Sequence, residues 1–175
     1  MTQALSPLPS TLDRAAFVAR FGGVYEHSPW IAERAFDAGL GADADTPEGL
    51  ARRLMEIVEA APSEWRLALL RAHPELAGKL ALRGELTADS TAEQASARLD
   101  QCSPEELARF TELNAAYGDR FGFPFIIAVR GLTRADILAA FKRRVSNTRE
   151  AELRTALDQV HKIARLRLEA MALGS

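Results

Sequence analysis

The chain has 175 residues, which is enough for one domain with a hydrophobic core and too few for two comfortable ones. Hydrophobic residues make up 47% and charged residues 26%, the balance of a soluble globular protein and not of a disordered one. The formal net charge is −2, with Lys and Arg scattered among Asp and Glu. The sequence therefore has no basic patch of the kind that binds nucleic acid.

Cysteine usage and the chain ends predict the compartment. Cys102 is the single cysteine, so no internal disulfide can form, and no Cys/His pairing has the spacing of a structural zinc site. Residues 1–10 lack the basic start and apolar core of a secretory signal, and the final Leu-Gly-Ser is not a peroxisomal address. The longest apolar stretch is far shorter than the ~20 residues of a membrane helix. We expect a soluble cytoplasmic protein with no membrane partner and no metal.

Helix-start signals recur through the first half of the chain. Each places a capping Ser, Thr or Asp before an apolar stretch with helical spacing, and Gly or Pro follows the stretch. After Thr46-Pro47, for example, Leu50, Leu54 and Val58 fall on one helix face. The predicted helices begin at Thr11–Asp13, Ser28-Pro29, Thr46-Pro47 and Ser63, and they end near Gly22, Gly39, Pro62 and His73.

In the second half, Leu80 to Asp89 has mixed polarity and predicts a loop or a broken helix. Further helix starts follow, two of them with the Ser-x-x-Glu pattern of a capping box, in which the two side chains satisfy each other's free backbone donors. The predicted starts are Ser90–Glu93, Ser103–Glu106, Thr133–Asp136, and Asn147 or Thr148 for the longest helix, which runs to about Met171.

One apolar stretch, residues 121–129, does not follow the helical pattern. Its length suits a buried strand or an extended buried segment, and because no second strand is predicted to pair with it we favour the extended segment. The sequence thus predicts an all-α fold. We expect one compact domain over residues 1–175 with about eight helices, the extended segment, and a flexible N-terminus at residues 1–10.

His73 is the first candidate for chemistry. It stands where Pro74 disfavours helical backbone and ends a helix, and histidine can exchange a proton near neutral pH. The plain alternative is a histidine that caps the helix and has no chemical role.

Glu93 and Arg167 are the other two candidates. Glu93 lies in the first turn of a predicted helix, and Arg167 lies beside the apolar stripe of the last helix, whereas Arg165 falls on its polar side. An arginine aimed at an apolar face needs an anionic partner. The alternatives are a capping-box glutamate and an arginine that extends its charge out of the core edge. His27, His161 and Cys102 have no flanking motif that indicates catalysis.

Four motifs in order resemble the 2-oxo-4-hydroxy-4-carboxy-5-ureidoimidazoline (OHCU) decarboxylase family. They span most of the chain and are specific in combination, although each alone is weak. The motifs are His73-Pro74-Glu75-Leu76-Ala77-Gly78-Lys79, Ser90-x-x-Glu93-Gln94, Phe121-Gly122-Phe123-Pro124-Phe125-Ile126 and Ile163-x-x-Leu166-Arg167-Leu168.

The resemblance implies a helical homodimer that completes the conversion of urate to (S)-allantoin without a cofactor. It implies that His73 is the catalytic acid/base, with Glu93 and Arg167 as partners in the pocket. It also implies substrate contacts from Pro74, Ser90, Thr91, Ala92, Glu93, Gln94, Phe125, Ile126, Ile127, Ala128 and Val129.

Two other functions are compatible with the residues alone. The chain could be a decarboxylase of a related ureide, with the same fold and histidine. It could also be a helical interaction module without catalysis, in which the His-Pro segment only ends a helix.

Overall fold

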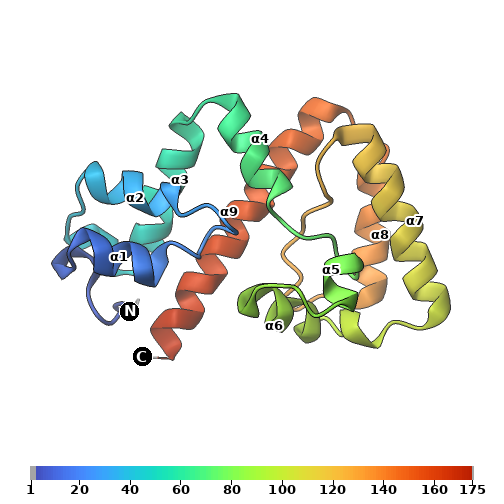
Figure 1. Cartoon of the computed structure of the whole chain (residues 1–175), viewed down its shortest axis with the longest axis horizontal. Coiled ribbons are helices and arrows are strands. Elements are labelled where there is room, and N and C mark those ends of the chain that lie inside the picture. The colour runs from blue at the N-terminus through green and yellow to red at the C-terminus, as the bar shows by residue number, and fades with distance from the viewer. Residues whose placement is uncertain (1–2, 175) are drawn as a thin grey trace. The chain divides into compact units, whose positions relative to one another are not determined.

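The computed structural model describes residues 3–174, and within them the chain forms nine α-helices and no strand (Figure 1). The all-α prediction is confirmed, and the helix beyond the expected eight is the four-residue α5, in the stretch predicted as a loop or broken helix. The helices are α1 (Arg14–Phe21), α2 (Trp30–Asp37), α3 (Pro47–Ala60), α4 (Ser63–Arg71), α5 (Lys79–Leu82), α6 (Ala88–Ser96), α7 (Pro104–Phe121), α8 (Arg134–Arg144) and α9 (Arg149–Leu173).

Contacts along the backbone group the chain into two compact units. The first comprises Met1–Ala72 and His161–Ser175, and the second comprises His73–Val160. The long helix α9 contributes its first half to the second unit and its second half to the first. His73 and Arg167, two of the three predicted catalytic residues, therefore belong to different units.

In the first unit, α1, α2 and α3 lie side by side (Figure 1). Asp13 caps α1 by accepting a hydrogen bond from the Ala16 backbone N–H, and α1 ends at Gly22 as predicted. Leu50, Leu54 and Val58 are buried along one face of α3. Burying this apolar stripe is the main stabilising contribution of the helix.

Two predicted caps in this unit are wrong. Ser28 does not cap α2, because its hydroxyl donates to the Glu26 carbonyl oxygen, and Pro29 occupies the cap position. Ser63 is the first residue of α4, not its cap, since Pro62 before it takes the extended backbone conformation of the cap position. A serine hydroxyl near a helix start has several backbone partners within reach, and the sequence does not determine which one it takes.

The N-terminal segment is attached to the first unit. Residues 1–2 lie outside the described part, but Leu5 is buried and its N–H donates to the Asp45 carbonyl oxygen at 2.8 Å. Ser10 donates to the Asp45 carboxylate from both its backbone N–H and its hydroxyl. Leu5 and Ser10 thus attach to the first unit within the stretch that was expected to be a flexible N-terminus.

The second unit is built on α7 and α8, which contact each other (Figure 1). Of the two predicted capping boxes, the one of Ser103 with Glu106 is confirmed at the start of α7. The helix start predicted at Thr133 is confirmed as well, and Thr133 and Asp136 form a capping box there. An aromatic cluster fills the space beside these helices. Its rings belong to Phe110, Tyr117, Phe121, Phe123, Phe125 and Phe141.

The predicted cap of α6 is wrong by three residues. Thr87 is the cap and its hydroxyl accepts from the Ser90 N–H, so Ser90 lies inside the first turn and Glu93 lies in the body of the helix. The chain contains two overlapping patterns, Thr87 with Ser90 and Ser90 with Glu93, and the first one forms. The predicted Ser90–Glu93 capping box is therefore absent.

Two further expectations are confirmed in this unit. After α7 ends, Gly122 adopts a φ of +78°, and residues 124–129 have no regular secondary structure, as expected for the extended segment. Thr148, of the two residues proposed, accepts a hydrogen bond from the Ala151 N–H at the start of α9.

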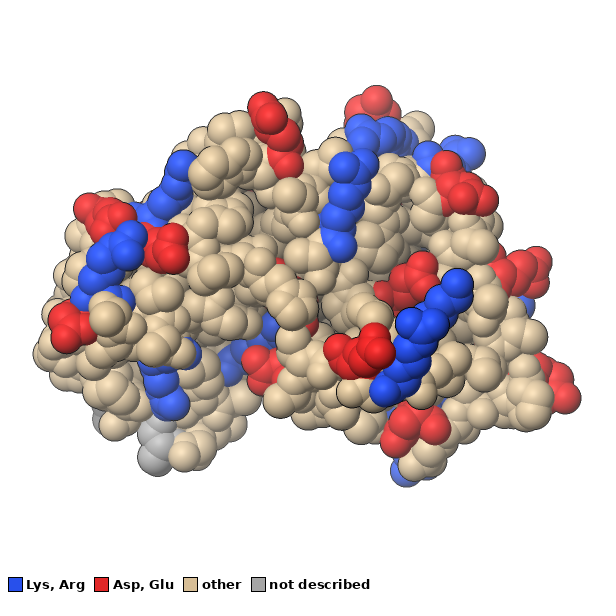
Figure 2. Space-filling view, in the orientation of Figure 1, with Lys and Arg blue, Asp and Glu red and all other residues tan. Residues whose placement is uncertain are grey.

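The distribution of charged side chains on the surface agrees with their scattered distribution in the sequence. On the face drawn in Figure 2, basic and acidic side chains are interspersed and do not form a large area of one sign. Among residues 3–174, no helix is long and apolar enough to cross a membrane.

Candidate active site

The loop that carries His73 is compact and buried. His73 follows the Ala72 cap of α4, and only 8% of its surface is exposed. Ala77 adopts a φ of +49°, a left-handed conformation that is costly for a residue with a side chain. A Cβ on Gly78 would lie 2.7 Å from the Cβ of Glu75, so the turn requires glycine there. The His-Pro loop (residues 73–78) thus has a defined and partly strained backbone.

Two amide side chains hold the His-Pro loop in place. Gln94 of α6 accepts from the Ala77 N–H at 3.1 Å and donates to the Glu75 carbonyl oxygen at 3.2 Å. Asn114 of α7 donates to the Leu76 carbonyl oxygen at 3.0 Å. Both amides are buried. The loop is therefore fixed by hydrogen bonds from two helices, an arrangement that gives His73 a defined position.

The run of residues 90–94 lies on α6, and its helical spacing divides it between two faces. Ser90 and Gln94 are buried and Glu93 is half-buried, whereas Thr91 and Ala92 are exposed. Positions 90, 93 and 94 share one face because residues three and four apart are neighbours on a helix. The structure thus brings Gln94 to the His-Pro loop and turns Thr91 and Ala92 toward another side of α6.

The extended segment is anchored at two neighbouring peptide groups. Arg144 of α8 donates from Nη1 to the Ile126 carbonyl oxygen at 2.8 Å, and the Ala128 N–H donates to Gln159 Oε1 of α9 at 2.9 Å. Ile127 lies between these two anchors and is half-buried. Among the described residues, its own N–H and C=O make no hydrogen bond.

Arg144 is itself held by a buried cluster. Its guanidinium donates to both carboxylate oxygens of Glu152, which also accepts from the Tyr117 hydroxyl at 2.5 Å and from the Asn147 amide at 3.0 Å. Arg144 also lies over the Phe125 ring, 4.4 Å from its centroid. Burial raises the pKa of Glu152, but the hydrogen bonds from its three partners outweigh burial and hold that pKa below its usual value.

Arg167 is buried in the first unit, as the helical pattern predicts. Its Nη2 donates to Glu26 Oε2 at 2.9 Å, and its Nη1 donates to the Val24 carbonyl oxygen at 3.4 Å. Both side chains of this ion pair are nearly inaccessible to solvent, at 5% and 2%. Arg165 is 57% exposed and pairs with Glu169 one turn further along α9. The predicted orientation of the two arginines is therefore confirmed.

A second histidine takes part in a partly buried chain of hydrogen bonds in the same unit. His161 Nδ1 lies 2.7 Å from the Tyr25 hydroxyl, and its Nε2 lies 2.9 Å from Glu59 Oε1. Burial and the Glu59 charge raise the pKa of Tyr25. His27 is exposed, as expected for a loop position. Tyr25 and Glu26 are adjacent in sequence, so His161 and Arg167 hold the same short segment.

Sequence reasoning missed four residues that hold predicted site residues in place, and Asn114, which holds the His-Pro loop, is one of them. Glu26 pairs with Arg167, while Arg144 and Gln159 anchor the extended segment. Arg144 carries a weak signal, since it follows Phe141 by three residues on a helix whose apolar face is buried. For Glu26 and Gln159 the sequence has none, because each contact joins residues far apart in the chain. Within residues 3–174, no three His, Cys, Asp or Glu side chains are grouped as a metal site requires.

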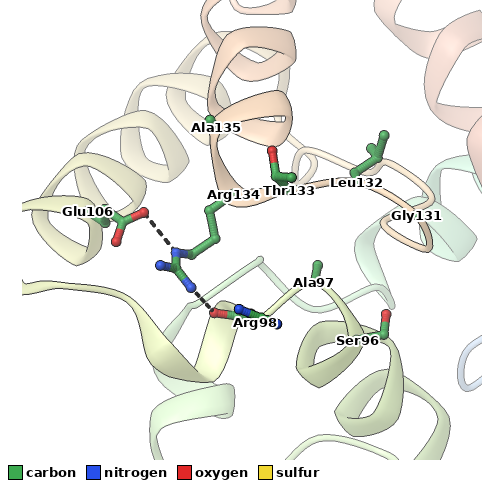
Figure 3. A pocket seen from close by; sticks show the side chains of 9 residues that line it. All are labelled: Ser96, Ala97, Arg98, Glu106, Gly131, Leu132, Thr133, Arg134 and Ala135. Carbon is green, nitrogen blue, oxygen red and sulfur yellow. Dashed lines mark hydrogen bonds and ion pairs between the residues drawn. The ribbon is translucent and has the colours of Figure 1, made fainter.

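Two pockets lie in the second unit, and neither is lined by His73 or Glu93. One, of about 340 Å³, is formed partly by Ala77, Thr91, Gln94 and Cys102. The other, of about 620 Å³, lies at the start of α8, where the Arg134 side chain extends between the Glu106 carboxylate and the Arg98 carbonyl oxygen (Figure 3).

Comparison with known proteins identifies the class. A family model described as OHCU decarboxylase matches residues 10–169. A 2-oxo-4-hydroxy-4-carboxy-5-ureidoimidazoline decarboxylase from Haloferax volcanii is 47% identical over 157 residues, which is 90% of this chain and 89% of the relative. The fold and the matched length together define an all-α protein of the decarboxylase class.

Two solved structures resemble the chain. A crystal structure of (S)-allantoin synthase has a TM-score of 0.75 and 35% identity, and the match covers 93% of this chain and 52% of that one, so the chain spans about half of its length. A crystal structure of OHCU decarboxylase in the presence of (S)-allantoin has a TM-score of 0.64 and 26% identity, covering 79% of this chain and 87% of that one. This chain belongs to the OHCU decarboxylase family.

Proposed function

We propose that the chain decarboxylates OHCU to (S)-allantoin, the last step of urate oxidation in purine degradation. The observation that carries this proposal is the family match over residues 10–169, which includes the segments of both units that hold the predicted catalytic residues. The buried His-Pro loop supports it, because two helices clamp the backbone of the loop that begins with His73, and proton transfer requires such a fixed geometry.

Decarboxylation of OHCU requires that the developing negative charge is stabilised and that one face of the ring is then protonated. Loss of CO2 from the quaternary carbon leaves an electron pair, and the neighbouring imidazoline group can take it up as an enolate-like anion. The substrate thus supplies its own electron sink. The protein has to hold the carboxylate, stabilise the developing anion and deliver a proton to one face of the ring.

His73 is the residue to which we assign proton transfer, with Pro74 as a neighbouring substrate contact. Its loop is attached to α6 through Gln94, and Glu93 directly precedes Gln94 on that helix. We assign Glu93 the role of orienting His73 or tuning its pKa, and its position beside Gln94 supports this assignment. Gln94 Nε2 has a second hydrogen beyond the one donated to Glu75, and this hydrogen is available for the substrate contact expected of Gln94.

Arg167 is the residue to which we assign the positive charge that meets the anionic substrate or the enolate. Its pairing with Glu26 supports this role, since the carboxylate holds the guanidinium in a fixed position inside the protein. Arg165 is exposed and paired on the helix surface, which makes it the poorer candidate.

The extended segment is the proposed binding surface for the polar edge of the ring, through residues 125–129. The Ile126 carbonyl and the Ala128 N–H are bonded within the protein, whereas the main-chain groups of Ile127 between them make no hydrogen bond among the described residues and are free to bind the substrate. An adjacent N–H and C=O match the alternating acceptors and donors of a ureide edge.

Circular dichroism of freshly generated urate-oxidation products tests the function. Urate oxidase and hydroxyisourate hydrolase supply the substrate, which decays unaided to racemic allantoin, so a dichroic signal reports the enzyme. We expect a fast signal with the wild type and a loss of roughly 10²- to 10⁴-fold with His73→Ala. A flat trace from folded wild-type protein would reject the proposal in favour of another ureide or a non-catalytic module, and near-full turnover by His73→Ala would reject that assignment.

A matched pair of variants tests the arginine. Arg167→Ala should lose activity, and Arg165→Ala, from the exposed face of the same helix, should keep it. The reverse result would exchange their roles. Far-UV circular dichroism of each variant shows whether the fold is retained.

Two further proposals are a homodimer, which the resemblance supports, and a cytoplasmic location, which is the expectation from the sequence. Light scattering coupled to size-exclusion chromatography tests the first. A mass near 19.1 kDa would contradict the dimer. Fractionation of the source cells tests the second.

A further inference from the structure

We infer that Arg144 and Gln159 are positioning residues for substrate binding, because together they set the direction of the free main-chain groups of Ile127. The inference rests on the proposed function, in which residues 125–129 contact the substrate. Neither residue belongs to the motifs that carry the resemblance, and the observations that point to them are their hydrogen bonds to two adjacent peptide groups.

The planarity of the peptide group fixes the directions of the free Ile127 N–H and C=O. The peptide bonds on both sides of Ile127 are trans, and in a trans peptide the C=O and N–H point in opposite directions. Arg144 holds the Ile126 carbonyl oxygen, so the Ile127 N–H in the same plane points away from Arg144. Gln159 holds the Ala128 N–H, so the Ile127 C=O in that plane points away from Gln159. The two anchors thus fix both free groups of one residue.

Arg144 is well suited to act as an anchor because it has little freedom of its own. Glu152 binds it through both carboxylate oxygens, and Tyr117 and Asn147 fix Glu152 in turn. Glu152 is fully buried. A buried ion pair gives little net stability over apolar residues of similar volume, so stability alone is a weak reason for this cluster. Holding a particular carbonyl oxygen in a particular direction is a requirement that apolar residues cannot meet.

Gln159 provides an independent test of the same idea. It is half-buried, lies on α9 and bonds the segment through a single acceptor atom. Replacing it disturbs no ion pair, so the variant should fold. Gln159→Leu removes the acceptor at similar size, whereas Gln159→Glu keeps an acceptor oxygen. Asp158, the exposed neighbour on the same helix, pairs with Arg154 one turn earlier and supplies the control Asp158→Ala.

Steady-state kinetics with freshly generated substrate separate positioning from simple support of the fold. A group that contacts the substrate equally before and during reaction changes KM with little change in kcat. We expect Gln159→Leu to raise KM by about 3- to 10-fold, the value of one hydrogen bond, and Gln159→Glu to restore it. Arg144→Lys, which keeps the charge beside Glu152 but not the planar fork, should raise KM in the same way. Asp158→Ala should leave both constants unchanged.

These measurements distinguish failure of this inference from failure of the proposed function. No turnover by the wild type would overturn the function and this inference with it. An active wild type, with Gln159→Leu lowering only the melting temperature and leaving KM unchanged, would overturn the inference alone. A Gln159→Glu variant as impaired as Gln159→Leu would also overturn it, because the acceptor atom would then not be the reason for the effect.

Discussion

Replacing Glu26 with alanine should destabilise the protein strongly, although Glu26 belongs to no recognisable motif. Its carboxylate accepts from Arg167 Nη2 at 2.9 Å, and both side chains are almost completely buried. The variant leaves the guanidinium in a buried position with one anionic partner fewer, and a buried arginine cannot neutralise itself by losing a proton.

The size of the effect follows from the geometry. Two unit charges 2.9 Å apart attract by about 6 kcal/mol at an effective dielectric constant of about 20, and the cost of removing them from water offsets part of this. Loss of one partner of such a pair typically costs about 3–5 kcal/mol. For a chain of this size this lowers the melting temperature by about 6–20 °C. Glu26→Gln keeps an acceptor oxygen and should cost less.

Urea denaturation followed by far-UV circular dichroism at pH 7 measures the loss. Glu169→Ala is the matched control, because Glu169 pairs with Arg165 on the exposed face of the same helix, where an ion pair contributes about 1 kcal/mol or less. If Glu26→Ala and Glu169→Ala lowered the free energy of unfolding by the same small amount, the burial argument for the Arg167 pair would be refuted.

Three further predictions concern the second unit. Thr87→Ala should lower the free energy of unfolding by about 1 kcal/mol, because the α6 cap is lost, and Thr87→Ser should restore it. If Thr87→Ala melted at the same temperature as the wild type, Thr87 would not be the cap of α6. Arg144 and Tyr117 hold the pKa of Glu152 in the folded protein below its unfolded value of about 4.3. The stability that ionised Glu152 contributes is therefore complete above that pH, and it is lost as the pH falls through the folded pKa. The melting temperature of Glu152→Gln should accordingly depend less on pH between about 4 and 2 than that of the wild type. Burial raises the pKa of Cys102, so iodoacetamide should modify it more slowly at pH 7.5 than it modifies a free cysteine derivative, and rapid labelling would contradict this.

Local signals determined much of the fold. Ser103 with Glu106 forms the capping box that its spacing predicts, and Thr133 with Asp136 forms another at the helix start predicted there, because a box needs only two side chains and the backbone of one helical turn. The stripe on α3 is buried as expected for the same reason, since helical periodicity alone selects the face. The orientation of Arg167 into the core also follows from periodicity.

Where two local patterns compete, tertiary structure decided between them. Thr87 and not Ser90 caps α6, and Ser90 is then buried inside the first turn, where its position depends on what packs against the helix. Ser28 bonds the Glu26 carbonyl instead of capping α2. In each case the hydroxyl has more than one partner within reach, and the energies of the alternatives differ by too little for sequence alone to choose.

The sequence by itself determined the helices, their faces, the unpaired extended segment and the residues that resemble a decarboxylase site. Only the tertiary structure decided which groups hold those residues. The hydrogen bond between Arg167 and Glu26 joins residues 141 positions apart in the sequence. The bond between Ala128 and Gln159 spans 31 positions, and the bond between Leu76 and Asn114 spans 38. Such partners leave no periodic or local pattern, because a buried polar group requires some partner but chain folding alone determines which one is within hydrogen-bond distance.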